Sequence, residues 1–160
     1  MVRDRISEDI YLFSSTRYAQ VSAGAVLSPE GAALIDTLAF PTETLEIRHF
    51  IEHKMGCKVR WVINTHHHAD HTMGNYLFPE AEIIAHQLCR ELLDTRGRQG
   101  LEAAKGHTPE LEGVAIVLPT LAFSKVTVAS PPVCAGPKCA SAIVSPPTCS
   151  LHAVSKSVSA

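Results

Sequence analysis

Residues 64–71 read Asn64-Thr65-His66-His67-His68-Ala69-Asp70-His71, and they directly follow an apolar run at 59–63 that has the composition of a buried strand. Four of these eight side chains are imidazoles and one is a carboxylate. Neutral imidazole and carboxylate are preferred ligands of Zn²⁺ and related cations, and histidine clusters are compositionally unusual outside metal sites. The stretch therefore predicts a metal site at the end of a strand.

The spacing within this stretch divides the expected ligands into two pairs. His66 and His68 are separated by one residue, so their side chains point the same way in an extended backbone and are able to chelate one ion. Asp70 and His71 follow where the chain turns, and this pair faces a second ion. The side chain of His67 is expected to point away from the first pair and to pack or be solvated. A purely structural origin of the cluster is the weaker reading, because these polar groups would be buried or solvated without gain.

Outward from the cluster, strand and helix patterns alternate. Residues 28–31 have the composition of a turn, and a helix is expected from Pro41 to Gly56. Helical patterns also follow the cluster. Such alternation predicts an α/β domain with at least part of its sheet parallel. Strands are expected at 10–13, 21–27, 32–35, 59–63, 82–85 and 114–118, and helices at 41–55, 87–93 and 99–105.

Three motifs together resemble a known family. His-x-His-x-Asp-His after an apolar strand, followed by Gly74-Asn75, is similar to the signature of the metallo-β-lactamase superfamily, in the form seen in glyoxalase II-like hydrolases. The flanking runs 31–37, which contains Asp36, and 83–86, which ends in His86, extend the resemblance over roughly 10–125. It implies the family's αββα sandwich, of which we expect only the first half to be complete.

The resemblance also implies roles for these residues. His66 and His68 correspond to ligands of a first metal, and Asp70 and His71 to ligands of a second, with Zn²⁺ expected and Fe or Mn not excluded. Asp70 would in addition orient the nucleophile as a catalytic residue, and Asp36 would hydrogen-bond a ligand imidazole or the backbone. The implied reaction is hydrolysis of an ester, thioester, lactone or amide carbonyl by a hydroxide that the metal activates.

The second half of the family's ligand set is not visible in the sequence. A bridging aspartate would be expected late in the chain, yet no aspartate follows Asp94, and the later histidines are His107 and His152. Gly106-His107-Thr108-Pro109 resembles a third motif, but a helix-to-loop junction is the better reading. The alternative function is therefore a truncated, catalytically inactive chain that still binds metal.

Composition excludes other classes of partner. The 160 residues carry a net charge of −2 and a pI near 6.5, so nothing favours nucleic acid or an anionic membrane, and a small-molecule substrate is expected. No secretory signal or apolar membrane span is evident, which predicts a cytoplasmic protein. The odd number of cysteines favours free thiols, and self-association that covers an exposed sheet edge is a further possibility. His49 and His53 lie four apart on the expected helix, a spacing that is able to bind metal, although a shared solvated face is the simpler reading.

The composition changes beyond about residue 125. All sixteen acidic residues lie at or before Glu112, and the segment 129–160 is rich in Ser, Pro, Ala and Cys. We expect two parts, a metallo-β-lactamase-like part at 1–128 and an irregular tail at 129–160, and an out-of-frame origin of the tail is one hypothesis. Cys134, Cys139, Cys149 and His152 could be read as a zinc knuckle that organises an interaction module, but their spacing is looser than in typical zinc sites.

Overall fold

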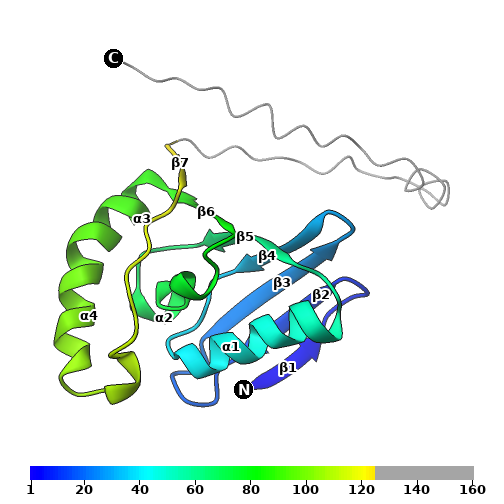
Figure 1. Ribbon diagram of the computed structural model, residues 1–160, viewed down its shortest axis with the longest axis horizontal. Coiled ribbons are helices and arrows are strands. Elements are labelled where there is room, and N and C mark those ends of the chain that lie inside the picture. The colour runs from blue at the N-terminus through cyan, green and yellow to red at the C-terminus, as the bar shows by residue number, and fades with distance from the viewer. Residues whose placement is uncertain (125–160) are drawn as a thin grey trace. The chain divides into compact units, whose positions relative to one another are not determined.

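The computed structural model describes residues 1–124 of the chain, and these residues build one seven-stranded sheet (Figure 1). The spatial order of the strands, β1-β2-β3-β4-β5-β6-β7, is also their order along the chain. Strands β1 to β4 pair antiparallel, and β4 to β7 pair parallel. The mixed sheet confirms the expected α/β class. The strands are β1 (Val2–Arg5), β2 (Ile10–Ser14), β3 (Ser22–Ser28), β4 (Gly31–Ile35), β5 (Val59–Asn64), β6 (Glu82–His86) and β7 (Leu121–Phe123).

Helical segments form each parallel crossover, as parallel pairing requires. Between β4 and β5 lie α1 (Pro41–His49) and the π-helical turn η1 (Phe50–Lys54). Between β5 and β6 lie α2 (Ala69–Thr72) and the 3₁₀ turn η2 (Asn75–Leu77). The last crossover holds α3 (Gln87–Leu92), the π-helical turn η3 (Leu93–Gly97), α4 (Arg98–Lys105) and the 3₁₀ turn η4 (Pro109–Leu111).

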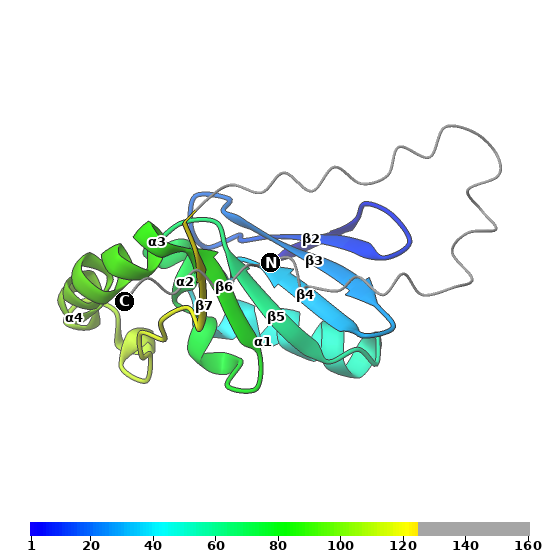
Figure 2. The same cartoon turned by 90° about the horizontal axis from the view of Figure 1, so that it is seen from above.

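Helix α1 covers one face of the sheet. Figure 2 shows it lying across the strands, while α3 and α4 lie at the end of the sheet formed by β6 and β7. Alternate residues of the strands point into this interface, which is the period-2 pattern of a strand with one buried face. The main core contains Phe13, Ala25, Leu34, Leu38, Ile47, Phe50, Ile51, Val62 and Ile83, among others.

Two sequence signals for chain reversal are confirmed. Gly31 adopts a φ of +140° at the end of the β3–β4 turn, and Gly56 adopts a φ of +65° where the first helical crossover ends. Both values lie in the region that favours glycine because it has no Cβ. Pro41 occupies the first turn of α1, where its missing N–H leaves no bond unmade.

Three expectations about elements are wrong. The run 114–118 is not a strand: Val114 packs with Met73, Leu101 and Leu111 in a second small core, and the strand β7 begins only at Leu121, beyond Pro119. The helices expected at 87–93 and 99–105 are one continuous helical stretch through η3, and β1 was not expected.

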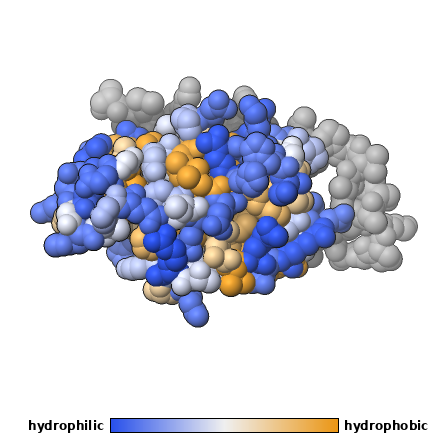
Figure 3. Space-filling model, turned by 60° about the horizontal axis from the view of Figure 1, so that its bottom comes forward, coloured by the Kyte–Doolittle hydropathy of each residue, from blue (hydrophilic) through white to orange (hydrophobic). Residues whose placement is uncertain are grey.

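The other face of the sheet carries a continuous apolar row. One residue from each strand from β2 to β7 is paired in register with the next, and none of the six is fully buried. We call this set the apolar row: Leu12, Gly24, Ile35, Ile63, Ile84 and Leu121. Figure 3 shows one view of the molecular surface, in which hydrophilic residues predominate and hydrophobic residues form smaller groups between them.

An ion pair fastens η4 to the start of α1. The guanidinium of Arg17 donates to both carboxylate oxygens of Glu110, at 2.9 and 2.7 Å, and the hydroxyl of Thr42 donates to Glu110 Oε1 at 2.7 Å. The same guanidinium lies 3.9 Å from the ring centroid of Phe40. The hydrogen bonds from Arg17 and then Thr42 lower the pKa of Glu110 to about 2. Three segments far apart in the sequence are thereby joined.

Two further expectations concern cysteines and the membrane. Cys89 is buried, as expected for a small core residue, and burial raises the pKa of its thiol to about 11. Within residues 1–124, no helix has the length and apolar character that a membrane crossing needs. The tail at 129–160, the boundary at 128 and the cysteine-histidine set lie outside the described residues.

Candidate metal centre

The histidine cluster lies at the carboxyl end of β5, directly beside the ends of its parallel neighbours β4 and β6. Ligands in open α/β sheets bind at this end of the strands, where the connecting loops meet. Three of the four predicted metal ligands are histidines, and the structure brings the rings of His66, His68 and His71 together. The ring centroids of His66 and His71 are 4.2 Å apart, and those of His66 and His68 are 4.7 Å apart.

Asp70, the fourth predicted ligand, lies beside His71. Oδ2 of Asp70 is 3.4 Å from Nε2 of His71, and both residues lie in the single turn of α2. Asp70 and His71 were predicted to form one ligand pair, and their polar atoms are adjacent. His67 contacts the ring of His68 at 4.7 Å between centroids, while no contact between its ring and those of His66 or His71 is found in residues 1–124. Contrary to the expectation, His67 therefore does not point away from the whole first pair, because its ring lies against that of His68.

Asp36 orients the cluster from the end of β4. Its Oδ2 lies 2.9 Å from Nδ1 of His71, and the same oxygen accepts the hydroxyl of Thr65 at 2.7 Å. Its Oδ1 accepts the backbone N–H of Thr65 at 2.9 Å. Only 4% of Asp36 is exposed. The expected hydrogen bonds of Asp36 to a cluster imidazole and to the backbone are therefore present.

These contacts fix which ring nitrogens carry protons. A carboxylate only accepts, so His71 donates from Nδ1 to Asp36, and in the neutral ring Nε2 is the nitrogen that carries the lone pair. The one hydroxyl proton of Thr65 is given to Asp36, so Nδ1 of His66, 3.0 Å from Thr65 Oγ1, must be the donor there. His66 therefore also presents a free lone pair on Nε2. Histidines that bind metal characteristically donate their second ring nitrogen to a carboxylate or similar acceptor.

The electrostatics of the cluster also favour neutral imidazole. Burial lowers the pKa of His66, and the positive charges that His71 and His68 would carry lower it further. Burial, then His68 and His66, lower the pKa of His67. Neutral imidazole is the form that binds cations, so His66 is biased toward its ligating state.

The donor atoms do not all meet at one point. Among residues 1–124, no group of three or more His, Cys, Asp or Glu side chains is arranged at metal-binding distances. The residue types, their ring separations and their tautomers fit a divalent cation, while the convergence of the donor atoms is incomplete. His68 is exposed, so its ring is free to rotate toward the other two.

A set of buried hydrogen bonds that the sequence did not reveal holds the loop in place. The side-chain amides of Asn64 and Asn75 donate to each other's carbonyl oxygens at 3.1 and 2.9 Å. The backbone carbonyl of His71 accepts from the amide of Asn64 at 3.3 Å and from both the N–H and the hydroxyl of Thr37, at 3.1 and 3.2 Å. The only sequence signal for this network was the presence of an asparagine on each side of the histidine cluster.

Two other histidines lie apart from these contacts. His107 is exposed just after α4, and its backbone N–H bonds Ala104, which agrees with a helix-to-loop junction rather than a third ligand motif. His86 caps α3 by accepting the N–H of Leu88 at Nδ1, 3.1 Å away, and its ring packs on Phe123. His86 thus has a structural role at the end of β6.

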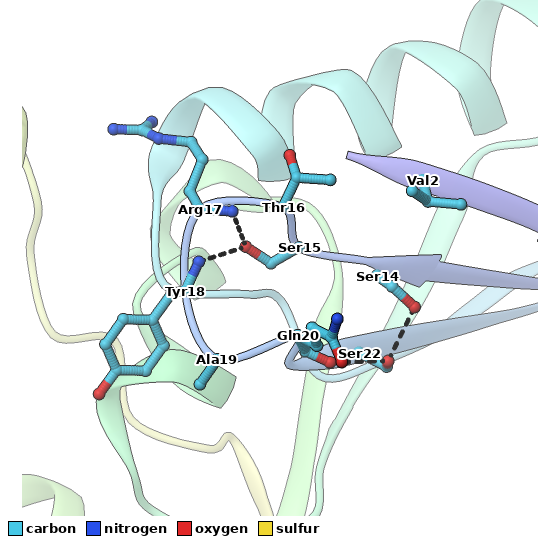
Figure 4. A pocket seen from close by; sticks show the side chains of 9 residues that line it. All are labelled: Val2, Ser14, Ser15, Thr16, Arg17, Tyr18, Ala19, Gln20 and Ser22. Carbon is cyan, nitrogen blue, oxygen red and sulfur yellow. Dashed lines mark hydrogen bonds between the residues drawn. The ribbon is translucent and has the colours of Figure 1, made fainter.

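A pocket elsewhere in the molecule contains none of the predicted ligands. The loop between β2 and β3 forms it, and hydroxyl and backbone groups line much of it (Figure 4). The hydroxyl of Ser15 accepts the backbone N–H groups of Arg17 and Tyr18 and gives this loop its shape. Ser15 in turn donates to the buried carboxylate of Glu43 at 2.8 Å.

The model of one protein family, described as the metallo-beta-lactamase superfamily, matches residues 17–134. The chain belongs to the metallo-β-lactamase superfamily. The match spans both the histidine cluster and Asp36. A comparison of the chain with curated proteins found no match.

Several solved structures of metallo-β-lactamases have the same fold as this chain. A metallo-beta-lactamase from Pontibacter korlensis aligns with a TM-score of 0.61 and 20% identity over 79% of this chain and 54% of its own. One from Hirschia baltica aligns with a TM-score of 0.59 and 14% identity over 81% and 54% of the two chains. One from Erythrobacter litoralis gives 0.58 and 17% over 76% and 49%. The chain therefore spans about half the length of these structures.

Proposed function

We propose that this chain is a metal-dependent hydrolase whose cation is held by His66, His68, Asp70 and His71. The observation that carries the proposal is the hydrogen-bond chain through Asp36 and Thr65, which engages Nδ1 of both His71 and His66 and makes Nε2 the ligating nitrogen of each neutral ring. We propose Zn²⁺ as the cation, and Fe or Mn would suit the same ligand types. A bound cation would polarise a carbonyl and lower the pKa of a water molecule.

The chain's own residues supply the remaining parts of the proposed mechanism. Asp36 holds the ring of His71 at a fixed angle, since its carboxylate is buried and anchored by the backbone N–H of Thr65. Asp70 is 22% exposed and next to the cluster, so its carboxylate is available to accept a proton from an attacking water. The substrate we propose is a small molecule with an ester, thioester, lactone or amide carbonyl, and cytoplasmic location stays a prediction that cell fractionation would test.

The first test combines turnover with metal content on one sample of the full chain. We expect a chromogenic ester, thioester or cephalosporin to be hydrolysed with added Zn²⁺, and we expect a chelator or His68→Ala to abolish the turnover. His107→Ala is the matched control, because this exposed histidine lies outside the cluster, and it should leave turnover unchanged. Hydrolysis that survives both the chelator and His68→Ala would contradict the proposal.

A second candidate function is a metal-binding chain without turnover. One observation favours it, the incomplete convergence of donor atoms in residues 1–124. This candidate predicts that Zn²⁺ binds and that His68→Ala weakens the binding, while none of the three substrate types is hydrolysed. The same experiment therefore separates the two functions.

A further inference from the structure

Two histidines far from the cluster in the sequence form a pair on the surface of the first helical crossover. His49 is the last residue of α1, and His53 lies in η1. Both side chains are exposed, and their ring centroids are 4.7 Å apart with an angle of 32° between the ring planes. The two imidazoles thus stand side by side in solvent, and the proposed hydrolase mechanism does not use them.

The spacing of the two residues explains this close approach. Residues four apart are neighbours on the surface of a helix. A π-helical turn follows α1 here and keeps His53 on the side of the helix that carries His49. The N–H of Met55 bonds the carbonyl of Phe50, five residues earlier, which marks the wide turn. His53 is thereby brought over His49.

Packing fixes which way this pair faces. Ile47, Phe50 and Ile51 are buried against the sheet, so the helix cannot rotate about its axis, and the two histidines stay on the solvent side. The pair also lies in the last turns of the helical crossover, where unpaired carbonyl groups give a partial negative charge that favours a cation.

The cationic side chain that precedes His49 in the sequence is already occupied. Nε of Arg48 donates to the carboxylate of Glu52 at 2.9 Å, and Nη1 of Arg48 donates to the backbone carbonyl of Leu77 at 2.8 Å. The charge of Arg48 is therefore compensated and held away from the histidine pair. A divalent cation arriving at the pair meets two imidazole rings and no uncompensated charge from Arg48.

We propose that His49 and His53 chelate one divalent transition-metal cation, with water completing its coordination shell. No group of three or more His, Cys, Asp or Glu ligands exists around the pair in the described part of the chain, so this is a two-ligand site. Its selectivity then follows the preference of each cation for imidazole, with Cu²⁺ strongest, then Ni²⁺ and Zn²⁺, and no binding of Mg²⁺ or Ca²⁺. The site is independent of the proposed hydrolase centre.

The test measures bound Cu²⁺, Ni²⁺ and Mg²⁺ per full-length chain by equilibrium dialysis after removal of metal with a chelator. We expect His49→Ala and His53→Ala each to lose one equivalent of bound Cu²⁺ and Ni²⁺ relative to the parent chain. His107→Ala, which removes another exposed histidine, should lose none, and Mg²⁺ should not bind to any of these chains. Equal Cu²⁺ stoichiometry in the parent, His49→Ala and His53→Ala would overturn the proposal.

Thermal unfolding gives a second readout that does not depend on stoichiometry. A cation bridging His49 and His53 binds only the folded helix, so Ni²⁺ should raise the Tm of the parent chain and of His107→Ala. In the absence of metal, His49→Ala should unfold at the parent temperature, because the side chain is exposed, and Ni²⁺ should raise its Tm by less than it raises that of the parent.

The His68→Ala background distinguishes this site from the proposed hydrolase centre. In that background we expect the equivalent that depends on His49 to remain, whatever happens to hydrolysis. Loss of the His49-dependent equivalent on His68→Ala would show a single shared site and would contradict two independent ones. Failure of turnover with retention of this equivalent would count against the proposed function alone.

Discussion

A single hydroxyl group decides how the histidine cluster presents its lone pairs. Thr65 gives its only hydroxyl proton to Asp36, which compels His66 to donate from Nδ1 and leaves Nε2 free. The positions of protons on His66 and His71 thus depend on one threonine and one aspartate. Groups that orient metal ligands in this way influence metal affinity although they do not touch the metal.

Thr65→Val tests this dependence, since valine has nearly the shape of threonine and no hydroxyl. We expect the affinity for Zn²⁺, measured by competition with a chromogenic chelator, to fall by about 10–100-fold. Thr65→Ser keeps the hydroxyl and should bind Zn²⁺ like the parent chain. Equal affinities of Thr65→Val and Thr65→Ser would show that the hydroxyl has no role.

Glu110 makes the stability of the fold depend on pH in a defined range. Its pKa falls from 4.5 to about 2 in the folded chain, so the unfolded chain binds the proton first as pH decreases. The stabilisation is therefore complete above pH 4.5 and is lost as pH falls toward about 2. Denaturant unfolding of the parent and Glu110→Gln should show a difference in free energy at pH 6 that shrinks steadily below pH 4.5. A difference that stays constant to pH 3 would contradict this assignment.

At the scale of elements, two glycines in helical segments have opposite surroundings. A Cβ at Gly74, just after α2, would lie 2.6 Å from two side-chain atoms of Thr44 and 2.8 Å from Cβ of Thr37. A Cβ at Gly100, inside α4, would meet nothing within 4 Å. The first glycine permits close packing of the cluster loop on α1, whereas the second only weakens its helix.

Alanine at these two positions should therefore change stability in opposite directions. We expect Gly74→Ala to destabilise the fold by about 1–3 kcal/mol, because buried threonines must move. We expect Gly100→Ala to stabilise it by about 0.5–1 kcal/mol through helix propensity. Urea unfolding of both variants measures the two effects, and destabilisation by Gly100→Ala would refute the account of α4.

The elements also show how far local sequence patterns reach. The strand before the cluster, the turn at Gly31 and the start of α1 at Pro41 follow from composition over a few residues, and all were predicted. The strand expected at 114–118 was not found, because Val114 joins Met73 in the small core and pairing with β6 begins only when Thr120 bonds Ile83. Contacts between residues far apart in the sequence decide which apolar run pairs with β6. Local periodicity does not contain this information.

The candidate site divides in the same way. The ligand types and their pairing were predicted from spacing, and Asp36 came from the family resemblance. The role of Thr65 and the amide pair of Asn64 and Asn75 were not predicted, because each depends on atoms brought together by the pairing of β4 with β5 or by the return of the loop. Residue type indicates the chemistry of a site, whereas tertiary contacts fix its protonation.

At the scale of the whole described fold, the apolar row gives the sheet a second face that is not fully buried. The row crosses six strands that lie about 4.8 Å apart, so with strands roughly 17 Å long this face offers on the order of 400 Å². Stable interfaces bury about 800 Å² per partner. We infer that two copies of the chain associate weakly through this face, whereas the sequence analysis considered association through a sheet edge.

Val26 and Leu45 provide a matched pair of variants for this inference. Val26 lies on the same face as the apolar row and is 39% exposed, while Leu45 lies on α1 and is 46% exposed. Sedimentation equilibrium should show an average mass that rises with concentration for the parent and for Leu45→Lys, and less so for Val26→Lys, because a charge at the interface opposes association. A monomeric parent chain at all concentrations would exclude the dimer.

The sheet is ordered in space as it is along the chain, and this has a consequence for how it forms. Every strand pairs with the strand that precedes it along the chain, so the first additions close only tight turns and the later, parallel additions close the helical crossovers. During translation the sheet is able to lengthen one strand at a time at a single growing edge, beginning with the β1–β4 meander. The histidines directly follow β5, so they reach the end of the sheet when β5 pairs with β4.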